Sequence, residues 1–196
     1  MRRIHFLITI FSVAVAVMAL SQISVAQNRR ALAEAQRITG DTFKLAVRTP
    51  KGANIYAVTQ PNAAMLAAID QGLTDLFAVA RKNRYSRRLN YSDYTVFVAK
   101  ADREKGADGS YSPDIAVGAA QYAGTDYDQG GYIFAAGMVI SNDPAAFVIA
   151  EHKRDLKRVS DIVRFEGEHL VLYHNDRRRY SQTADHSKGG GHPILQ

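Results

Sequence analysis

The sequence predicts a single α+β domain with a largely antiparallel sheet and a long C-terminal helix. Helical and strand-like patterns follow one another in the order helix, two strands, helix, three strands, helix. The apolar content of 46% is typical of a chain that folds around a core. After removal of a leader, about 170 residues are left, a length that suits one domain.

Residues 1–26 have the pattern of a secretory signal peptide. Arg2 and Arg3 precede an apolar run from Phe6 to Leu20, and small residues lead to Ala26. The apolar run is shorter than the roughly 20 residues that a helix needs to span a membrane. No later segment is expected to span a membrane either. We therefore expect a secreted or periplasmic product without an integral membrane segment. Its 23 basic and 19 acidic residues lower the formal charge from +6 to +4.

The chain contains no cysteine. Disulfides, thiolate zinc sites and a cysteine nucleophile are therefore excluded. An exported domain without disulfides must obtain its stability from its core, or from a metal held by histidines and carboxylates.

The first elements are predicted from their periodicity. Residues 29–38 carry apolar side chains at helical spacing, and Gly40 is a suitable stop for this helix. Residues 43–49 and 55–59 alternate between apolar and polar side chains, which predicts a hairpin.

Asn62 is predicted to cap a helix that ends near Asn83. Strands are then expected at residues 94–100, 115–122 and 132–140, followed by a helical pattern from about Pro144 to Asp176. We accordingly place the α+β domain at residues 27–176 and an irregular tail rich in glycine and histidine at residues 177–196.

Two polar residues lie on the apolar face of the C-terminal helix. Glu166 and His169 are three residues apart, so their side chains meet. Tyr173 and, if the helix extends so far, Asp176 return to the same side. A carboxylate on such a face is costly unless it is paired or binds a metal. Glu168 is expected to point outward.

Two interpretations of Glu166 and His169 follow. They form a buried hydrogen bond that orders the core, with Tyr173 joining it, or they belong to a metal site, because Glu-x-x-His is a ligand spacing used on helices. Four of the five histidines after the leader fall in the final 28 residues. If the tail returns over the helix, the candidate metal ligands are His169, His174, Asp176, His186 and His192.

The run from Val163 to His169 resembles the active-site helix of the zincin metallopeptidases, in which His-Glu-x-x-His supplies two zinc ligands and a general base. The resemblance implies that Glu166 is the base and His169 the second ligand. Phe165 occupies the position of the first ligand. A zincin-like architecture with a degenerate or rebuilt metal site is what the resemblance implies.

Basic residues gather in two runs, residues 81–88 and residues 177–179. Arg84, Arg87 and Arg88 are candidate contacts for an anionic component of the cell envelope. A solvated surface is the alternative interpretation. Nucleic acid is not expected as a partner, because the charge excess is small.

Two functions remain open at this level. The first is a secreted, zincin-like, metal-dependent hydrolase of peptides or similar bonds, in which Glu166 takes the proton from water. The second is a non-catalytic envelope or extracellular binding protein in which Glu166 and His169 form a structural pair. Zinc, another divalent ion or no cofactor at all are compatible with these residues.

Overall fold

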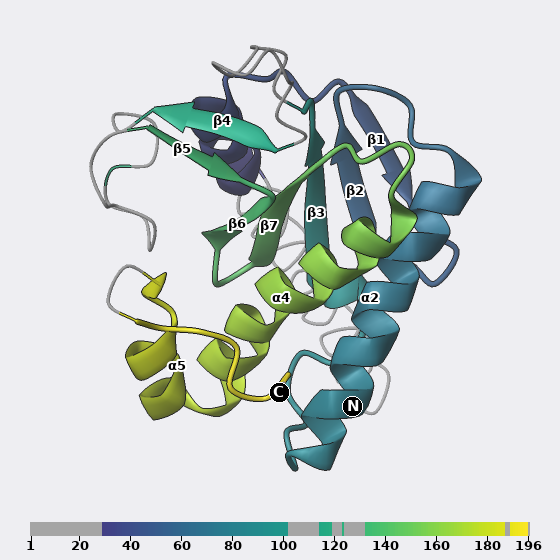
Figure 1. Cartoon of the computed structure of the whole chain (residues 1–196). Coiled ribbons are helices and arrows are strands. Elements are labelled where there is room, and N and C mark those ends of the chain that lie inside the picture. The colour runs from purple at the N-terminus through teal and green to yellow at the C-terminus, as the bar shows by residue number, and fades with distance from the viewer. Residues whose placement is uncertain (1–28, 102–113, 119–122, 124–131, 187–188, 196) are drawn as a thin grey trace, which may run out of the picture.

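The computed structural model describes residues 29–101, 114–118, 123, 132–186 and 189–195. The proposed leader, residues 1–26, lies outside them. Residues 29–39 form the predicted N-terminal helix, which ends where Gly40 adopts a φ of 69° and donates its N–H to Gln36 O. The predicted hairpin follows as β1 (Leu45–Arg48) and β2 (Asn54–Ala57), which pair antiparallel (Figure 1).

The second helix begins and ends as predicted. α2 spans Ala63–Lys82, and the side chain of Asn62 caps it by accepting the N–H of Met65 at 2.8 Å. By length and composition α2 is apolar enough to cross a membrane, contrary to our expectation for the segments after the leader. In this fold its apolar face, including Ile69, Leu73 and Leu76, packs into the domain core instead.

The main sheet has five strands in the order β1-β2-β3-β7-β6, where β3 is Tyr94–Ala99, β6 is Gly137–Ser141 and β7 is Ala145–Ala150. Its outer pairs are antiparallel and its two central pairs are parallel, so the sheet is mixed. β4 (Ile115–Gly118) and β5 (Tyr132–Ala135) form a separate antiparallel pair. The α+β class is confirmed. The strand expected over residues 132–140 is divided into β5 and β6.

The helix expected from Pro144 is wrong in its first third. Residues 145–150 form β7, a central strand that is buried at every position. A short apolar run buried on both faces carries no period that distinguishes a strand from a helix. The long helix α4 (Leu156–Asn175) begins after Asp155, whose side chain accepts the N–H of Arg158 at 2.9 Å.

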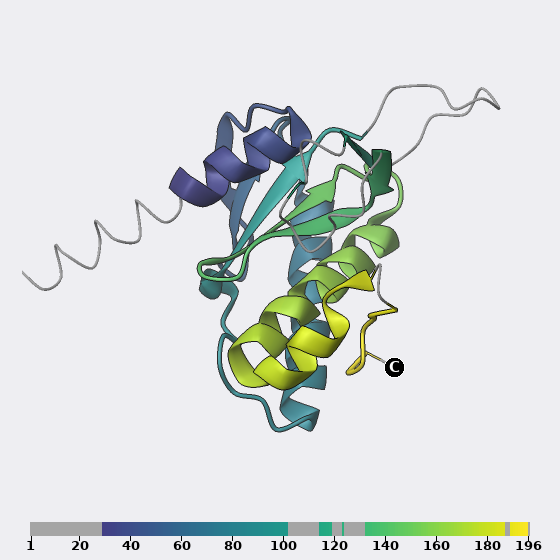
Figure 2. The ribbon, with the colours of Figure 1, turned by 90° about the vertical axis from the view of Figure 1, so that its left-hand side faces the viewer.

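The C-terminal segment is more regular than expected. α5 (Arg177–Thr183) follows directly after α4, and Asp176 caps it by accepting the N–H of Arg179 at 3.0 Å. The described residues beyond α5 then turn back beside α4 (Figure 2), and Ile194 is buried in the core.

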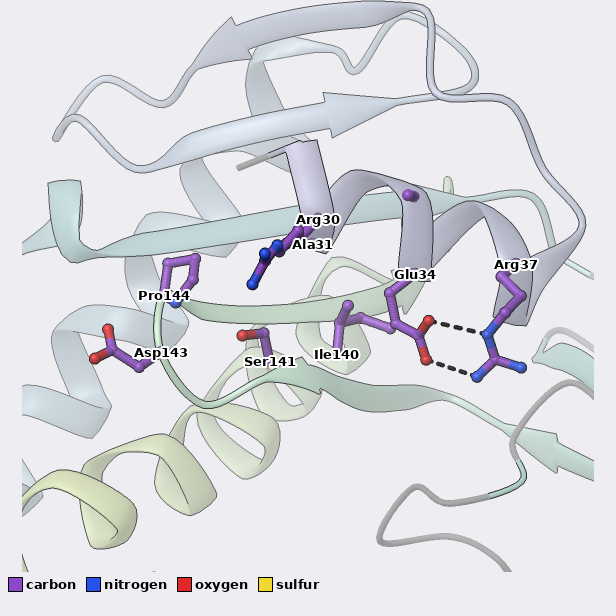
Figure 3. Close-up of a pocket in the computed structure, with 9 residues that line it drawn as sticks. Arg30, Ala31, Glu34, Arg37, Ile140, Ser141, Asp143 and Pro144 are labelled. Atoms are coloured by element: carbon purple, nitrogen blue, oxygen red, sulfur yellow. Dashed lines mark hydrogen bonds and ion pairs between the residues drawn. The ribbon is translucent and has the colours of Figure 1, made fainter. Parts of the chain in front are cut away.

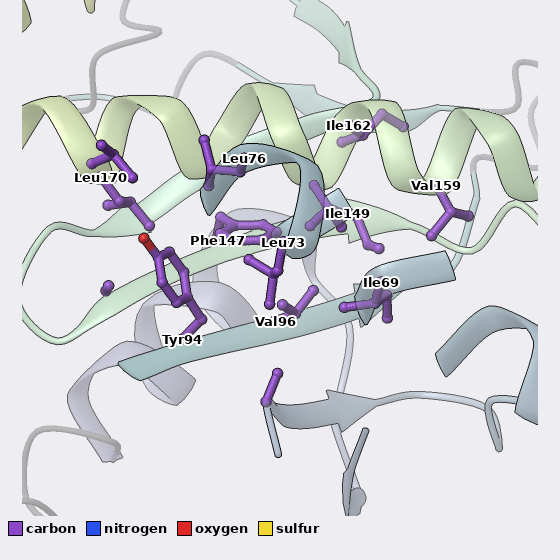
Figure 4. Packing of buried hydrophobic residues seen from close by; sticks show 14 of the residues in the cluster. Ile69, Leu73, Leu76, Tyr94, Val96, Phe147, Ile149, Val159, Ile162 and Leu170 are labelled. Carbon is purple, nitrogen blue, oxygen red and sulfur yellow. The ribbon is translucent and has the colours of Figure 1, made fainter. Parts of the chain in front are cut away.

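Apolar residues fill both faces of the sheet. α2 and α4 cover one face, where Leu73, Phe147 and Val159 are among the packed side chains (Figure 4). The N-terminal helix covers the other face. A Cβ atom at Gly72 of α2 would lie 2.5 Å from Ser160 O and 2.8 Å from Val163 Cβ, so only glycine permits this approach of α2 to α4. The close packing fixes α4, the helix that carries the candidate site.

Candidate metal centre

Three histidines that are distant in sequence meet beside α4. His169 comes from the middle of α4, whereas His186 and His192 come from the segment after α5. One ring nitrogen of each lies within 4.8 Å of the others. The ring centroids are 4.9–5.1 Å apart, a nearly equilateral triangle. We call these three residues the histidine triad.

His169 is the buried member of the triad, with an exposed fraction of 3%. Its Nδ1 is buried and has no hydrogen-bond partner among the described residues. Burial, together with the charges of His192 and His186, lowers the pKa of His169 to about 3. The imidazole is therefore neutral near pH 7, and this is the form that binds a metal ion.

A carboxylate orients His192. Nδ1 of His192 lies 2.9 Å from Oε2 of Glu168, and Oε1 of Glu168 accepts the N–H of Ile194 at 2.8 Å. A carboxylate only accepts, so Nδ1 of His192 carries the proton of this hydrogen bond, and in the neutral imidazole Nε2 is the nitrogen with the lone pair. A carboxylate behind the distal nitrogen is the common outer-shell partner of a metal-binding histidine.

The outward position expected for Glu168 is wrong. Its exposed fraction is 0%, because the returning C-terminal segment covers this side of α4. Phe165, at the position where the zincin resemblance expects a first ligand, stacks against the ring of His192 with the centroids 4.7 Å apart.

Glycines shape the turn that returns His192 to α4. A Cβ atom at Gly190 would lie 2.3 Å from Thr183 O and 2.6 Å from Asp185 O, and Gly189 has a φ of 80°. Gly190 N and Gly191 N donate to these same two carbonyls at 3.0 Å. The glycines that precede His192 therefore form a hydrogen-bonded turn that requires glycine at two of its positions. His186 and His192 are less buried than His169, so the triad extends from the core to the surface.

Glu166 lies one helical turn before His169 and is also buried, with an exposed fraction of 7%. It packs against the edge strand β6. A Cβ atom at Gly137 would lie 2.8 Å from Cγ and 3.1 Å from Oε1 of Glu166. Gly137 therefore lets the edge strand approach this carboxylate. Glu166 and His169 are therefore both buried on α4, and their pairing stays a prediction.

The other two candidate ligands are used elsewhere. Nε2 of His174 donates to Asn142 O at 2.8 Å. Asp176 caps α5 and accepts the hydroxyl of Tyr85 at 3.2 Å. The structure groups neither residue with the triad.

Tyr173 faces α5. Its ring lies edge-on to Tyr180 at 5.2 Å and beneath the guanidinium of Arg177, which is 3.2 Å from the ring centroid. These contacts join α4 to α5. The structure gives no support for Tyr173 as a partner of Glu166 and His169.

The basic candidates divide into two kinds. Arg88 is half-buried and pairs with Asp143 at 2.9 Å and Asp93 at 3.7 Å. Arg84 and Arg87 are exposed.

A separate cavity of about 620 Å³ lies between the N-terminal helix and the β6–β7 turn (Figure 3). Arg30, Glu34 and Arg37 line it from the helix, and Ser141 and Asp143 from the turn. Glu34 and Arg37 pair with each other at 2.6 Å. The cavity contains no candidate site residue and no member of the triad.

Comparisons with known proteins found no matching family model, no similar curated protein and no similar solved structure. The zincin resemblance therefore stays a prediction that rests on the residues of α4.

Proposed function

We propose that this protein is an exported metalloprotein. It binds one divalent ion of the zinc type through His169, His186 and His192, and it hydrolyses a peptide or similar bond. The observation that carries the proposal is the buried Nδ1 of His169, which has no partner among the described residues and belongs to a ring facing two other imidazoles. A buried polar atom without a partner is costly, and a metal ion would remove that cost.

The residues present suit zinc. Three histidines with a fourth position left open are a donor set of catalytic zinc sites. Tetrahedral bonds of about 2.0–2.1 Å would place the ligand nitrogens about 3.3 Å apart. The triad nitrogens all lie within 4.8 Å of one another, so each pair has to approach by no more than about 1.5 Å. Glu168 supplies the outer-shell carboxylate through His192. Phe165 does not fit the zincin ligand pattern, and a histidine from the tail takes over that ligand's task.

The chemistry is divided between the ion and Glu166. When bound, a zinc-type ion polarises a carbonyl group and lowers the pKa of the water at its open position. Glu166 is buried on α4 one helical turn before His169, and it would serve as the general base toward water activated by such an ion. The edge strand β6 packs directly on Glu166 and bounds the reaction site on that side.

A structural role is the second candidate function. Two of the proposed ligands come from the C-terminal segment. Hydrogen bonds from His192 and from the backbone of Ile194 to Glu168 already hold that segment against α4. An ion bound by the triad would add a second link between the segment and α4. Under this alternative the protein binds metal without catalysing hydrolysis.

Replacing Glu166 with glutamine distinguishes the two functions. The variant should bind zinc with the stoichiometry and affinity of the wild type, because the triad is intact. Its hydrolysis of a mixture of quenched fluorescent peptides should fall by about 10²–10⁴-fold, the usual contribution of a general base. His174→Ala is the matched control, since this histidine lies on the same helix outside the triad.

A zinc-loaded wild-type protein without chelator-sensitive peptide hydrolysis would contradict the catalytic proposal and favour the structural one. Equal hydrolysis by the wild type and Glu166→Gln would remove Glu166 from the mechanism.

A further inference from the structure

The two basic runs of the sequence meet at one end of the molecule. Asn175, at the end of α4, accepts the N–H of Ser86 at 3.1 Å and of Arg87 at 2.9 Å. It also donates to Arg87 O at 3.0 Å. The hydroxyl of Tyr85 donates to Asp176 at the α4–α5 junction. The loop after α2 is therefore held firmly against the start of α5, although about 90 residues separate them in the sequence.

This junction displays six exposed cations, which we call the basic end face. Asp176, the acidic residue at the junction, is already bonded to Tyr85 and to the backbone of Arg179. Arg88 and Arg179 are excluded, because each pairs with a carboxylate. The basic end face consists of Arg81, Lys82, Arg84, Arg87, Arg177 and Arg178.

The fold gives little reason for most of these charges. Arg81 and Lys82 are in the last turn of α2, where cations favour the helix dipole. Arg177 and Arg178, however, are in the first turn of α5, where cations oppose it. Arg84 and Arg87 lie beyond the end of α2. Arg177 gains a contact with the Tyr173 ring. At the other three positions, charge costs stability or is neutral for it.

Arg84 also bears backbone strain. The N–H of Arg84 bonds to Arg81 O and that of Tyr85 to Ala80 O, the pattern of a helix end that usually has glycine at the position of Arg84. Its φ is 63°, in the left-handed region that a side chain rarely adopts. At this φ, arginine has a higher backbone energy than glycine would have. The backbone therefore favours glycine at position 84, but the sequence has a cation there.

We propose that the basic end face docks on an anionic phospholipid surface. A bilayer with anionic headgroups attracts clustered arginines and lysines over a broad area without a shaped groove. The face consists of helix ends and a loop, so it presents no helix flank or β-ribbon that enters a nucleic-acid groove. Tyr85, its aromatic residue, is half-buried and hydrogen-bonded, so it offers no platform on which bases stack. The inference does not depend on the metal centre.

Binding to lipid vesicles tests the proposal. The protein used is the chain from Gln27 onward, which includes every residue that the structure describes. The chain should sediment with phosphatidylcholine vesicles that contain 30% phosphatidylglycerol. It should not sediment with vesicles of phosphatidylcholine alone, and 0.5 M NaCl should release it. Each basic residue near such a surface contributes about fivefold to binding. Arg177→Gln combined with Arg178→Gln should therefore weaken binding about 25-fold.

Arg84→Gly separates docking from stability. This variant should weaken vesicle binding about fivefold while its melting temperature stays equal or rises, because glycine relieves the strain. Lys44→Gln combined with Arg48→Gln is the control. It removes two exposed charges, one from β1 and one from the residue before it, away from the α2 and α5 ends that form the face (Figure 1).

Three results would overturn the proposal. The first is no sedimentation with anionic vesicles. The second is a loss in the β1 control as large as in the α5 variant, which would indicate a net-charge effect. The third is tighter binding to duplex DNA than to the vesicles at equal salt, which would identify a nucleic acid as the partner.

Discussion

His169→Ala is expected to abolish stoichiometric zinc binding. His169 is the triad member supplied by the rigid helix α4, and the other two belong to the returning segment. Loss of an outer-shell partner typically costs 10–100-fold in metal affinity, so loss of a ligand should cost more than about 100-fold. Competition with a chromogenic chelator at pH 7.5, on protein without an affinity tag, measures this change.

Two comparisons show whether the effect belongs to the site. His174→Ala should retain wild-type zinc affinity, because His174 bonds to Asn142 O outside the triad. His169→Ala should remain folded, because α4 is anchored by Val159, Val163 and Leu170. Circular dichroism checks the fold. Zinc affinity equal to that of the wild type in His169→Ala would show that the triad is not the site.

Glu168→Ala is expected to affect stability and metal binding together. The carboxylate is fully buried and accepts from both His192 and the backbone of Ile194. Its removal should lower the free energy of unfolding by about 2–3 kcal/mol, because a buried donor loses its charged acceptor. Zinc affinity should fall about 10–100-fold, because His192 is no longer oriented. Urea unfolding and chelator competition measure the two effects, and limited proteolysis should show earlier cleavage between residues 184 and 195.

Glu151→Ala is the matched control for Glu168. Its side chain is almost as buried, and it bonds to Thr59 and Lys153 near the start of α4. This variant should lose stability and keep its zinc affinity. If Glu168→Ala destabilises the protein without weakening zinc binding, Glu168 holds the tail but does not orient a ligand.

The sequence predicts those elements whose signals, such as a helix cap or an apolar stripe, lie within the element itself. α2 has a side-chain cap and a continuous apolar stripe, so its start and end followed from the sequence. β7 was mistaken for helix because it is buried on both faces, which only the surrounding sheet and helices determine. The parallel pairing of β3 with β2 and β7 likewise depends on long-range packing.

The candidate site was likewise predictable from the sequence only in part. The clustering of histidines near the C-terminus indicated a site, and the structure groups His169, His186 and His192 from that set. Nothing local distinguished His186 from His174. The burial of Glu168 depends on a segment about 25 residues later, and a helical wheel gives only the direction of a side chain. The joining of the two basic runs also required the tertiary structure.

Anomalous X-ray diffraction at the zinc absorption edge, from crystals of the zinc-loaded chain, tests the metal centre most directly. We predict one strong peak between His169, His186 and His192, with three Zn–N bonds of about 2.0–2.1 Å. Nε2 of His192 should be the bonded atom, with Nδ1 still on Glu168. A peak elsewhere on the chain, or none within the triad, would contradict the proposed metal centre.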